Sequence, residues 1–313
     1  MDPLSDVLSL LRPRSFMSGG VEYGGDWAIR FGRHGGIKFQ AVISGGCWLA
    51  VDGVDEPVRV EAGDCYLLPR GLPFRLASDL SLPAVDGVAT LGLPLMGRLR
   101  VLNGGGGCLS IGGHFAFEGR HAEILLAALP PVVHLRKESD KAAMRWSVER
   151  LMLELREPQP GGDIIAQQLA TMLLVQALRL HLSDEAGAGA GWLSALADRQ
   201  MAVAMAAMHA EPGRRWTIAA LAERAAMSRS SFALKFRRVV GASPMDYLTR
   251  WRMMLAADRL SNGGATISTL APALGYESES AFSTAFKRVM GCAPRQYGRG
   301  EAVAASPGAP GPG

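Results

Sequence analysis

Two stretches near the C-terminal end of the chain carry side chains that could bind a polyanion. Each has serine or threonine hydroxyls followed by two adjacent cations, Arg237 and Arg238 in the first stretch and Lys287 and Arg288 in the second. Hydroxyl groups hydrogen-bond to the edges of bases, and basic side chains pair with phosphate oxygens. The chemistry that these residues indicate is therefore non-covalent binding of a nucleic acid.

These side chains belong to a sequence pattern that is written twice. The residues Phe232, Phe236, Gly241, Pro244 and Tyr247 recur at an offset of 50 as Phe282, Phe286, Gly291, Pro294 and Tyr297. Each copy contains a short apolar helix, a break, a polar cluster that can cap a helix, and a second helix that ends at glycine. This order is typical of a helix-turn-helix, whose second helix lies in the major groove of DNA.

The second helix of each copy is predicted to carry the contacts to DNA. We expect these helices at residues 229–240 and 279–290, with Ser228 and Ser278 as their N-caps. The predicted buried stripes are Phe232, Phe236 and Val239 in the first helix and Phe282, Phe286 and Val289 in the second. The opposite faces are predicted to bind DNA through Ser230, Ser231, Ala233, Leu234, Arg237 and Arg238 and through Glu279, Ser280, Ser283, Thr284, Lys287 and Arg288.

A helix over residues 244–260 should join the two copies, since its apolar residues have a helical spacing. It would be about 25 Å long, which could hold the two recognition helices about one DNA turn apart. Leu234 leaves the first recognition helix poor in bidentate base readers, so its specificity would rest on thymine methyls and serine hydroxyls. Pro272 is tolerated if its helix begins near Thr269, and otherwise predicts a kink.

The doublet resembles the DNA-binding domain of AraC/XylS-type transcription regulators, over roughly the last hundred residues before the tail. The residues that carry the resemblance are Ala225, Ala226, Met227, Ser228, Phe236, Arg237, Arg238, Gly241, Ala242, Ser243, Pro244, Tyr247 and Leu248 in the first copy, and Gly275, Tyr276, Ser278, Ala281, Phe282, Phe286, Lys287, Pro294 and Tyr297 in the second. The resemblance implies a sequence-specific regulator of transcription. We expect a cytoplasmic activator, and repression is the alternative that the sequence leaves open. It would bind double-stranded promoter DNA as a homodimer and meet RNA polymerase there.

The charge of the chain is unevenly distributed, as expected when a nucleic-acid-binding domain is joined to a different domain. Residues 192–299 contain 15 lysines and arginines against 7 acidic residues, a net charge of +8, whereas residues 1–191 carry −3. The N-terminus has no basic region of the kind found in signal peptides, and no apolar run approaches the ~18 residues that span a bilayer. We therefore expect a protein without a membrane partner.

The rest of the pattern predicts an α+β protein of two domains. From about residue 21 to 118, short apolar stretches alternate with glycine- and proline-rich turns, as in a β-sandwich or a small barrel. Helical periodicity follows at 122–129, 137–156 and 164–182, and one further helix is expected at 192–209. We expect residues 1–182 to form an effector and dimerisation domain, 183–191 a flexible linker, 192–298 the DNA-binding domain, and 299–313 a disordered tail.

Residues 61–74 resemble the second motif of cupins, in which a Gly-Asp turn leads a strand into Pro-x-Gly. Phe74 stands where metal-binding cupins have a histidine ligand, and His34 is the lone histidine where the first cupin motif would supply a pair. A metal site needs several nitrogen or oxygen ligands around one centre. The resemblance therefore implies a cupin-like β-barrel without a metal, and we expect no other cofactor.

Without a metal, the interior of this domain could bind a small-molecule effector, because barrel mouths are favoured ligand sites. The polar and aromatic candidates for ligand binding are Trp27, His34, Lys38, Gln40, Trp48 and Arg59. Strand alternation places Lys38 and Gln40 on one face but leaves open whether that face points inward. The alternative is that the tryptophans are core residues and that the other candidates face solvent.

A redox signal is a second hypothesis, since an accessible thiolate oxidises readily. Cys47, Cys65 and Cys108 are the candidates, and Cys108 follows the glycine run 104–107, where a thiol could be exposed. The alternative is that these cysteines are buried as small hydrophobes. The four cysteines of the chain lie far apart, which argues against a structural zinc site.

Two other protein classes compete with the regulator. A cupin-type metalloenzyme tethered to a DNA-binding domain would need metal ligands that the sequence lacks. A DNA-repair alkyl acceptor would need a zinc-activated cysteine cluster, whereas these cysteines are scattered. We therefore expect a regulator that is not an enzyme and that responds to a small molecule or a redox signal.

Overall fold

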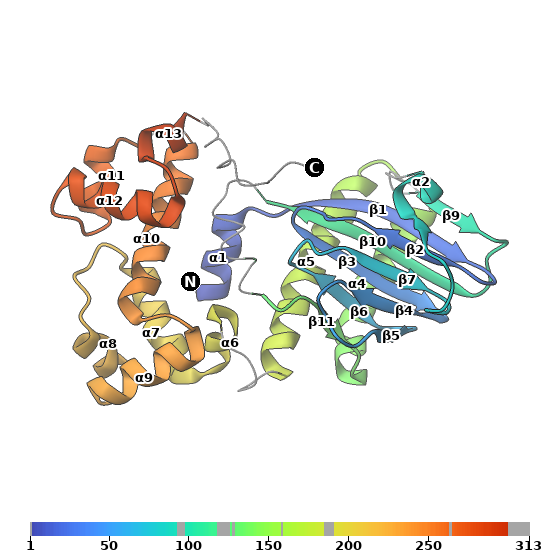
Figure 1. Cartoon of the computed structure of the whole chain (residues 1–313), viewed down its shortest axis with the longest axis horizontal. Helices are drawn as coiled ribbons and strands as arrows, with labels where there is room; N and C mark the ends of the chain where they lie inside the picture. Colours follow the sequence, from blue (N-terminus) through green and yellow to red (C-terminus); the bar gives the residue numbers. More distant parts are fainter. Residues whose placement is uncertain are drawn as a thin grey trace, which may run out of the picture. The chain divides into compact units, whose positions relative to one another are not determined.

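The computed structural model describes residues 2–92, 98–117, 126, 129–157, 159–184, 191–262 and 265–299, with the side chains of residues 17, 18, 183 and 184 left aside. The chain divides into two compact units (Figure 1). The sandwich unit comprises residues 12–118 and 123–188, and the helical unit comprises residues 1–11, 119–122 and 189–313. Most of the predicted helix at 122–129, of the linker and of the tail lies outside the described residues.

The sandwich unit is built on two β-sheets. The six-stranded sheet has the order β11 (Val133–Leu135), β6 (Cys65–Leu68), β3 (Ile37–Ser44), β10 (Cys108–Ala116), β1 (Arg14–Tyr23) and β9 (Arg98–Leu102). The five-stranded sheet has the order β5 (Val58–Glu61), β4 (Gly46–Val51), β7 (Phe74–Ala77), β2 (Ala28–Phe31) and β8 (Val85–Asp86), and α2 (Gly87–Leu91) follows β8. Because no described strand belongs to both sheets, the domain is an open sandwich, and the prediction of a barrel is wrong.

The core lies between the two sheets, because successive residues of a strand point to opposite faces. On β6, Tyr66 and Leu68 belong to this core, and they pair with Gln40 and Lys38 of β3. The face of β3 that carries Lys38 and Gln40 therefore points inward, which answers the question that the sequence left open. Ala41 and its partner Cys65 point outward, toward the helices.

Helices α4 (Glu138–Arg156) and α5 (Gly162–Asp184) form the expected helical hairpin. The two helices pack against each other, and α5 also packs against β1 and β11 of the six-stranded sheet. This position explains the apolar character of α5 on nearly all sides, since it is covered from more than one direction.

The helical unit consists, in its described part, of the N-terminal helix and eight C-terminal helices. They are α1 (Pro3–Leu11), α6 (Trp192–Ala197), α7 (Arg199–Ala210), α8 (Ile218–Arg224), α9 (Arg229–Val240), α10 (Pro244–Ser261), α11 (Ile267–Ala273), α12 (Glu279–Met290) and α13 (Pro294–Gly298). The prediction of one helix at 192–209 is wrong, because Asp198 divides it. The carboxylate of Asp198 accepts hydrogen bonds from the backbone N–H groups of Gln200 and Met201 at 3.0 and 3.2 Å, and so caps α7.

The N-terminal helix α1 differs from the expectation in its location. It is an amphipathic helix whose stripe of Leu4, Val7, Leu10 and Leu11 is buried. However, it packs against α6 and α7 of the helical unit, although the sequence pattern groups it with residues 12–182. A nine-residue helix cannot bury its apolar stripe alone, and here it does so against helices that lie far away in the sequence.

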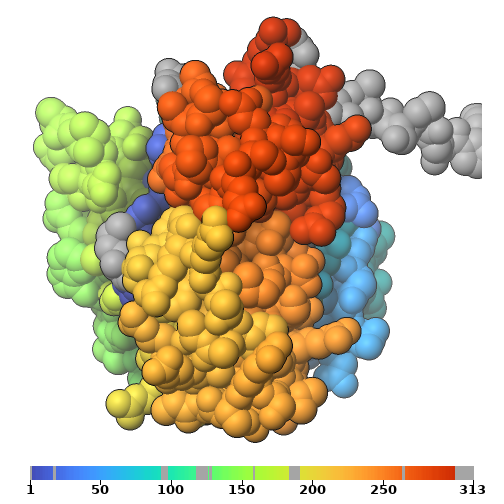
Figure 2. Space-filling view, turned by 90° about the vertical axis from the view of Figure 1, so that its left-hand side faces the viewer, coloured from blue at the N-terminus to red at the C-terminus, as the bar shows by residue number. Residues whose placement is uncertain are grey.

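Helix α10 joins the two copies as predicted. Helices α8 and α9 lie toward one end of α10, and α11 and α12 lie toward the other (Figure 1). Figure 2 shows the helical unit from another side, with the first copy in yellow and orange and the second in red. Helix α11 begins at Ile267, so Pro272 lies beyond its first turn, one residue before the helix ends.

Candidate nucleic-acid interface

The two predicted recognition helices begin and end in the same way. The Ser228 hydroxyl accepts a hydrogen bond from the Ser231 N–H, and the Ser278 hydroxyl accepts one from the Ala281 N–H, both at 3.2 Å. Both helices end at a glycine, with φ of 77° in the first and 80° in the second, a conformation that glycine adopts without strain. The predicted bounds of 229–240 and 279–290 agree with the structure.

The buried stripes of these helices run at a spacing of four residues. They consist of Phe232, Phe236 and Val240 in α9 and of Phe282, Phe286 and Met290 in α12. The predicted members Val239 and Val289 are only half-buried. The prediction is wrong at these two positions, because the helix turns the residue four places after the second phenylalanine toward the core instead.

The opposite faces place most predicted DNA contacts in solvent. Ala233 and Ser283 are half-buried, and the other predicted contact residues of α9 and α12 are exposed. Leu234 has 73% of its surface exposed, so it takes little part in the core of its own domain. A leucine in this position is free to contact an apolar group of a partner, such as a thymine methyl.

Some of the hydroxyls already have partners within their helix. Thr284 donates its hydroxyl hydrogen to the Ser280 carbonyl at 2.9 Å. The Ser228 hydroxyl donates to the Ser231 oxygen at 2.9 Å. Thr284 therefore offers a base its methyl group and its oxygen lone pairs, but not its hydroxyl hydrogen.

The four predicted phosphate-binding cations lie in the last turns of α9 and α12. Arg237, Arg238, Lys287 and Arg288 are exposed, and none of them has an ion pair with another residue of the described chain. Cations without an internal counterion can release the counterions of DNA without first breaking a salt bridge.

Two basic residues that the sequence analysis did not single out position the helices. Lys235 of α9 contacts Asp198 at 2.7 Å and the side-chain oxygen of Gln200 at 2.8 Å, which ties α9 to the start of α7. Arg252 of α10 donates to the carbonyls of Pro212 and Arg214 at 2.6 and 2.8 Å. In the sequence, each looks like an ordinary solvent-exposed basic residue of an amphipathic helix. Only the packing identifies their structural role.

Inside the sandwich, the predicted ligand residues divide into two groups. Lys38 and Gln40 line a small interior cavity of ≈ 40 Å³, and Gln40 accepts a hydrogen bond from the Tyr66 hydroxyl. Burial lowers the pKa of Lys38, and burial lowers the pKa of His34 to about 4. The buried Nε2 of His34 has no hydrogen-bond partner among the described residues.

The other three candidates lie away from that cavity. Trp27 is a core residue that stacks on Tyr23 with a ring separation of 3.8 Å. Trp48 alternates with the buried Cys47 and Leu49 on β4, and the Arg59 guanidinium lies 5.6 Å from the centre of its ring. These two side chains share the outer face of the five-stranded sheet.

All four cysteines are buried. Cys108 is only 2% exposed, so the expectation of an exposed thiol after the glycine run is wrong. The thiols of Cys47 and Cys108 hydrogen-bond to each other, which raises the pKa of Cys47 and lowers that of Cys108. Burial raises the pKa of Cys65 to about 12, which makes it a poor thiolate.

Neither a metal centre nor a membrane segment is visible in the described part of the chain. Its histidine, cysteine, aspartate and glutamate side chains form no group of three that could hold a metal ion. None of its helices combines the length and the apolar character needed to cross a bilayer.

Comparison with known proteins agrees with this arrangement. A cupin family matches residues 2–183, and a helix-turn-helix domain family matches residues 221–300. A Streptomyces lividans protein described as an AraC-like transcription regulator is 45% identical over 298 residues, which cover 95% of this chain and 98% of that protein. The RCS-specific HTH-type transcriptional activator RclR of Escherichia coli is 28% identical over 302 residues, which cover 95% of this chain and 97% of the activator.

One solved structure resembles the C-terminal part of the chain. The DNA-binding domain of AdpA, a global transcriptional factor crystallised with a target DNA, is 27% identical with a TM-score of 0.30, and the match covers 31% of this chain and 87% of that one. The full-length relatives are named as regulators and not as enzymes. The chain belongs to the family of AraC-like DNA-binding transcription regulators, with a cupin domain ahead of its tandem helix-turn-helix.

Proposed function

We propose that this regulator reads two successive major-groove segments with α9 and α12 and changes its DNA binding in response to a small molecule held in the sandwich unit. One observation carries the first half. From Ser228 to Gly241 and from Ser278 to Gly291, the order of exposed, half-buried and buried residues is identical. Each helix thus turns the same face away from its own core, and that face carries the four cations that have no ion pair with another described residue.

A salt titration of the full-length protein tests the DNA contacts. Replacing Arg237, Arg238, Lys287 and Arg288 with glutamine should lower the slope of log affinity against log salt by up to about 3.6, since each phosphate contact contributes ~0.9. Fluorescence anisotropy with labelled duplex between about 50 and 200 mM salt measures this slope. Arg179→Gln on α5 is the matched control and should leave the slope unchanged. An unchanged slope in the fourfold variant would contradict the proposed interface.

The proposed binding of a small molecule rests on polar side chains that line the cavity between the two sheets, within an otherwise apolar core. Lys38 is half-buried at the cavity between the sheets, beside Gln40 and without an acidic partner among the described residues. Even partial burial of a charge without a counterion is unfavourable, which favours a site that an anionic group completes. The present cavity of ≈ 40 Å³ is small, so the interior would have to open to hold an effector. The redox alternative has less support, because the candidate thiols are buried.

We also propose that the helical hairpin of α4 and α5 pairs two subunits. It leaves large apolar side chains in solvent, namely Trp146 (64% exposed), Leu153 (41%), Ile164 (66%) and Ile165 (40%). Several large apolar side chains exposed on the same pair of helices indicate an interaction surface. A homodimer of this kind would place two DNA-binding domains on one promoter, in the cytoplasm and within reach of RNA polymerase. The role of activator is proposed because a full-length relative is named as one.

Sedimentation of the full-length protein tests the pairing. The unmodified protein should be a dimer at micromolar concentration, and the double variant Trp146→Asp, Ile164→Asp should be a monomer, because charges are disfavoured in the core of an interface. Val203→Asp on α7 replaces an apolar residue that is 43% exposed in the helical unit, and it should leave the dimer intact. A monomeric unmodified protein would contradict this assignment.

A further inference from the structure

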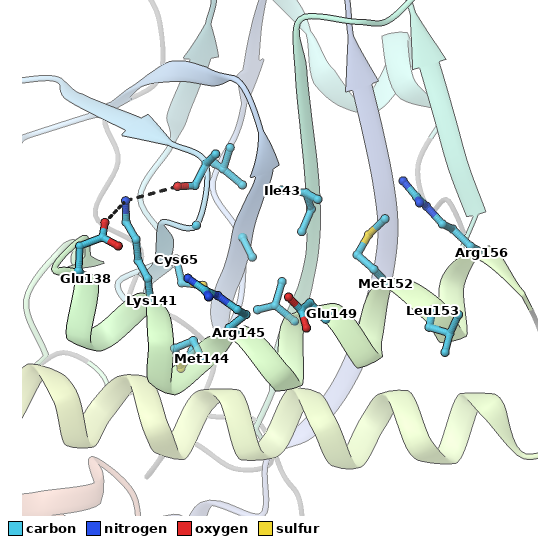
Figure 3. A pocket seen from close by; sticks show the side chains of 15 residues that line it. Ile43, Cys65, Glu138, Lys141, Met144, Arg145, Glu149, Met152, Leu153 and Arg156 are labelled. Carbon is cyan, nitrogen blue, oxygen red and sulfur yellow. Dashed lines mark hydrogen bonds and ion pairs between the residues drawn. The ribbon is translucent and has the colours of Figure 1, made fainter.

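A larger hollow lies on the outer side of the sandwich, between α4 and the six-stranded sheet (Figure 3). Its volume is ≈ 570 Å³, against ≈ 40 Å³ for the cavity between the sheets. Pockets that bury drug-sized ligands have volumes of about 300–1,000 Å³. All residues that line the hollow belong to the sandwich unit, so its shape depends on that unit alone.

The floor of the hollow is apolar. The sheet contributes Ala41 and its strand partner Cys65, each no more than 2% exposed. Helix α4 contributes Met144, Val148 and Met152 at a spacing of four residues, which keeps them on one side of the helix. Methionine side chains adapt to irregular ligand shapes, so this surface can accept an apolar body without a fixed outline.

One end of the hollow is fixed by an ion-pair cluster. Lys141 contacts the carboxylates of Asp64 and Glu138 at 3.2 and 3.3 Å and the Ala62 carbonyl at 3.3 Å. Asp64 is also 2.9 Å from the Nε2 of His134. These contacts join α4 to the turn between β5 and β6, where a Cβ on Gly63 would lie 3.0 Å from the Lys141 chain. The Lys141 charge is therefore already neutralised.

The remaining cations of the hollow are not neutralised in this way. Arg145 and Arg156 line it, and neither has an ion pair with another described residue. Glu149 lies one turn from Arg145 on the same helix and offsets part of its charge. Arg156 lies at the opposite end from Lys141, beside Met152 and Leu153 (Figure 3). It is the cation best placed to receive an acidic group, because a guanidinium binds a carboxylate or sulfonate with two hydrogen bonds.

We infer that the hollow is a binding site for an amphipathic organic anion, with its apolar body over Met144, Val148 and Met152 and its acidic group at Arg156. The inference rests on the proposed response to a small molecule, and it assigns a chemical class and a place to a second ligand of the sandwich unit. The site is distinct from the sandwich interior around Lys38. Helix α4, which lines the hollow, also carries the exposed Trp146, so an occupant can influence the proposed subunit contact.

Two fluorescent dyes that differ in charge test the inference on the full-length protein. The probes are 8-anilinonaphthalene-1-sulfonate, which is an anion, and the uncharged N-phenyl-1-naphthylamine. Arg156→Gln should weaken sulfonate binding by about tenfold, the value of a charge-assisted hydrogen bond, and leave binding of the neutral dye within about twofold. Val148→Trp should weaken both dyes, because the larger ring fills the floor of the hollow. Arg179→Gln on α5 should change neither.

Two outcomes would overturn the inference. If Arg156→Gln weakened both dyes equally, the acidic group would not bind at Arg156. If Val148→Trp left both affinities unchanged, the dyes would bind elsewhere; if it also dissociated the dimer in sedimentation, the hollow would be part of a subunit interface. DNA binding of each variant without dye, measured by anisotropy, shows whether the variant is folded. It also tests the proposed DNA-binding role independently of the dye measurements.

Discussion

The two helix-turn-helix copies have the same recognition helices but different supports. In the first copy, Lys235 ties α9 to Asp198 and Gln200 of α7. The corresponding residue of the second copy is Ala285, which can form no such contact, and α12 instead packs against α10, α11 and α13. The repeat therefore preserves the face toward each local core, whereas the attachment to the rest of the unit is specific to each copy.

The tyrosine near the end of each copy likewise has the same contact with its local core but different contacts with the rest of the unit. Tyr247 meets Phe236 edge-on at a ring separation of 5.8 Å, and Tyr297 meets Phe286 at 5.5 Å. However, Tyr247 also hydrogen-bonds to the buried His209 at 2.8 Å, and His209 is 3.3 Å from Asp6 of α1. No histidine follows His209 in the chain. The first copy thus depends on a titratable group and on the N-terminal helix.

The largest effect should come from the equivalent phenylalanines in the cores of the two copies. Phe232→Ala and Phe282→Ala each remove a side chain with no exposed surface, so each should lower the free energy of unfolding by about 3–5 kcal/mol. Urea unfolding of the full chain, followed by hydrogen exchange in the helical unit, measures both losses. Phe16→Ala, at a residue 46% exposed in the sandwich unit, is the control and should cost less than about 1 kcal/mol. If only one of the two variants lost much stability, Phe232 and Phe282 would not have equivalent roles in their cores.

A pH titration should separate the copies next. Burial lowers the pKa of His209 to about 3, so the folded protein keeps this ring neutral while the unfolded chain protonates it below about 6.5. The unfolded state then binds more protons, and stability should fall by up to about 1.4 kcal/mol for each unit of pH between 6.5 and 3. His209→Gln should remove the contribution of His209 to the slope of stability against pH. The other histidines are present in both proteins, so their contributions cancel in the difference between the two slopes.

Hydrogen exchange locates the change within the helical unit. In the unmodified protein at pH 5, α9 should lose protection before α12, because the buried His209 hydrogen-bonds directly to Tyr247 of the first copy. Equal loss in both helices, or a slope that His209→Gln leaves unchanged, would contradict a role for this histidine in the difference between the copies.

Local chemistry made the recognition helices predictable from the sequence. Ser228 and Ser278 begin them and Gly241 and Gly291 end them, and these signals act within one or two turns of the chain. The one systematic error, the choice of Val239 in place of Val240, arises because both residues are apolar and lie within one residue of each other. Only the packing decides which of them faces the core.

Long-range contacts made the rest unpredictable. Nothing in the residues around Asp6 indicates that α1 will meet His209, more than two hundred positions away. The same holds for Lys141, whose ion pair with Asp64 joins α4 to the turn before β6 at one end of the hollow. Asp198 is an exception, because its carboxylate caps α7 locally and could have signalled the break in the expected helix at 192–209.

A smaller effect should separate base reading from phosphate binding. Thr284→Ala should weaken a preferred site by ~1 kcal/mol and relax its sequence preference, whereas Arg238→Ala should weaken all sequences alike and lower the salt slope by about one. Because the Thr284 hydroxyl already donates to the Ser280 carbonyl, Thr284→Val should retain more of the preference than Thr284→Ser. Titrations against matched and scrambled duplexes at several salt concentrations measure this. If Thr284→Ala weakened binding to all sequences equally, the proposed orientation of α12 on DNA would be wrong.

The smallest effect should arise where the two reading faces differ most. Leu234 occupies the position that Thr284 has in the second copy, and it can offer a base only apolar contact. Leu234→Thr should therefore change affinity for a preferred site by a few tenths of a kcal/mol, since loss of contact with a thymine methyl is offset by a new hydroxyl. The stability of the helical unit should not change, because 73% of the Leu234 side chain is exposed.

Base substitution within the half-site gives the decisive measurement for Leu234. Replacing thymine with uracil removes the methyl group and leaves the hydrogen-bonding edge intact. The unmodified protein should lose affinity at one such position in the half-site of α9, and Leu234→Thr should lose less there. The corresponding substitutions under α12 should affect both proteins equally. If uracil at every position of the first half-site weakened both proteins alike, Leu234 would have no part in reading DNA, and α9 would serve only to position α12.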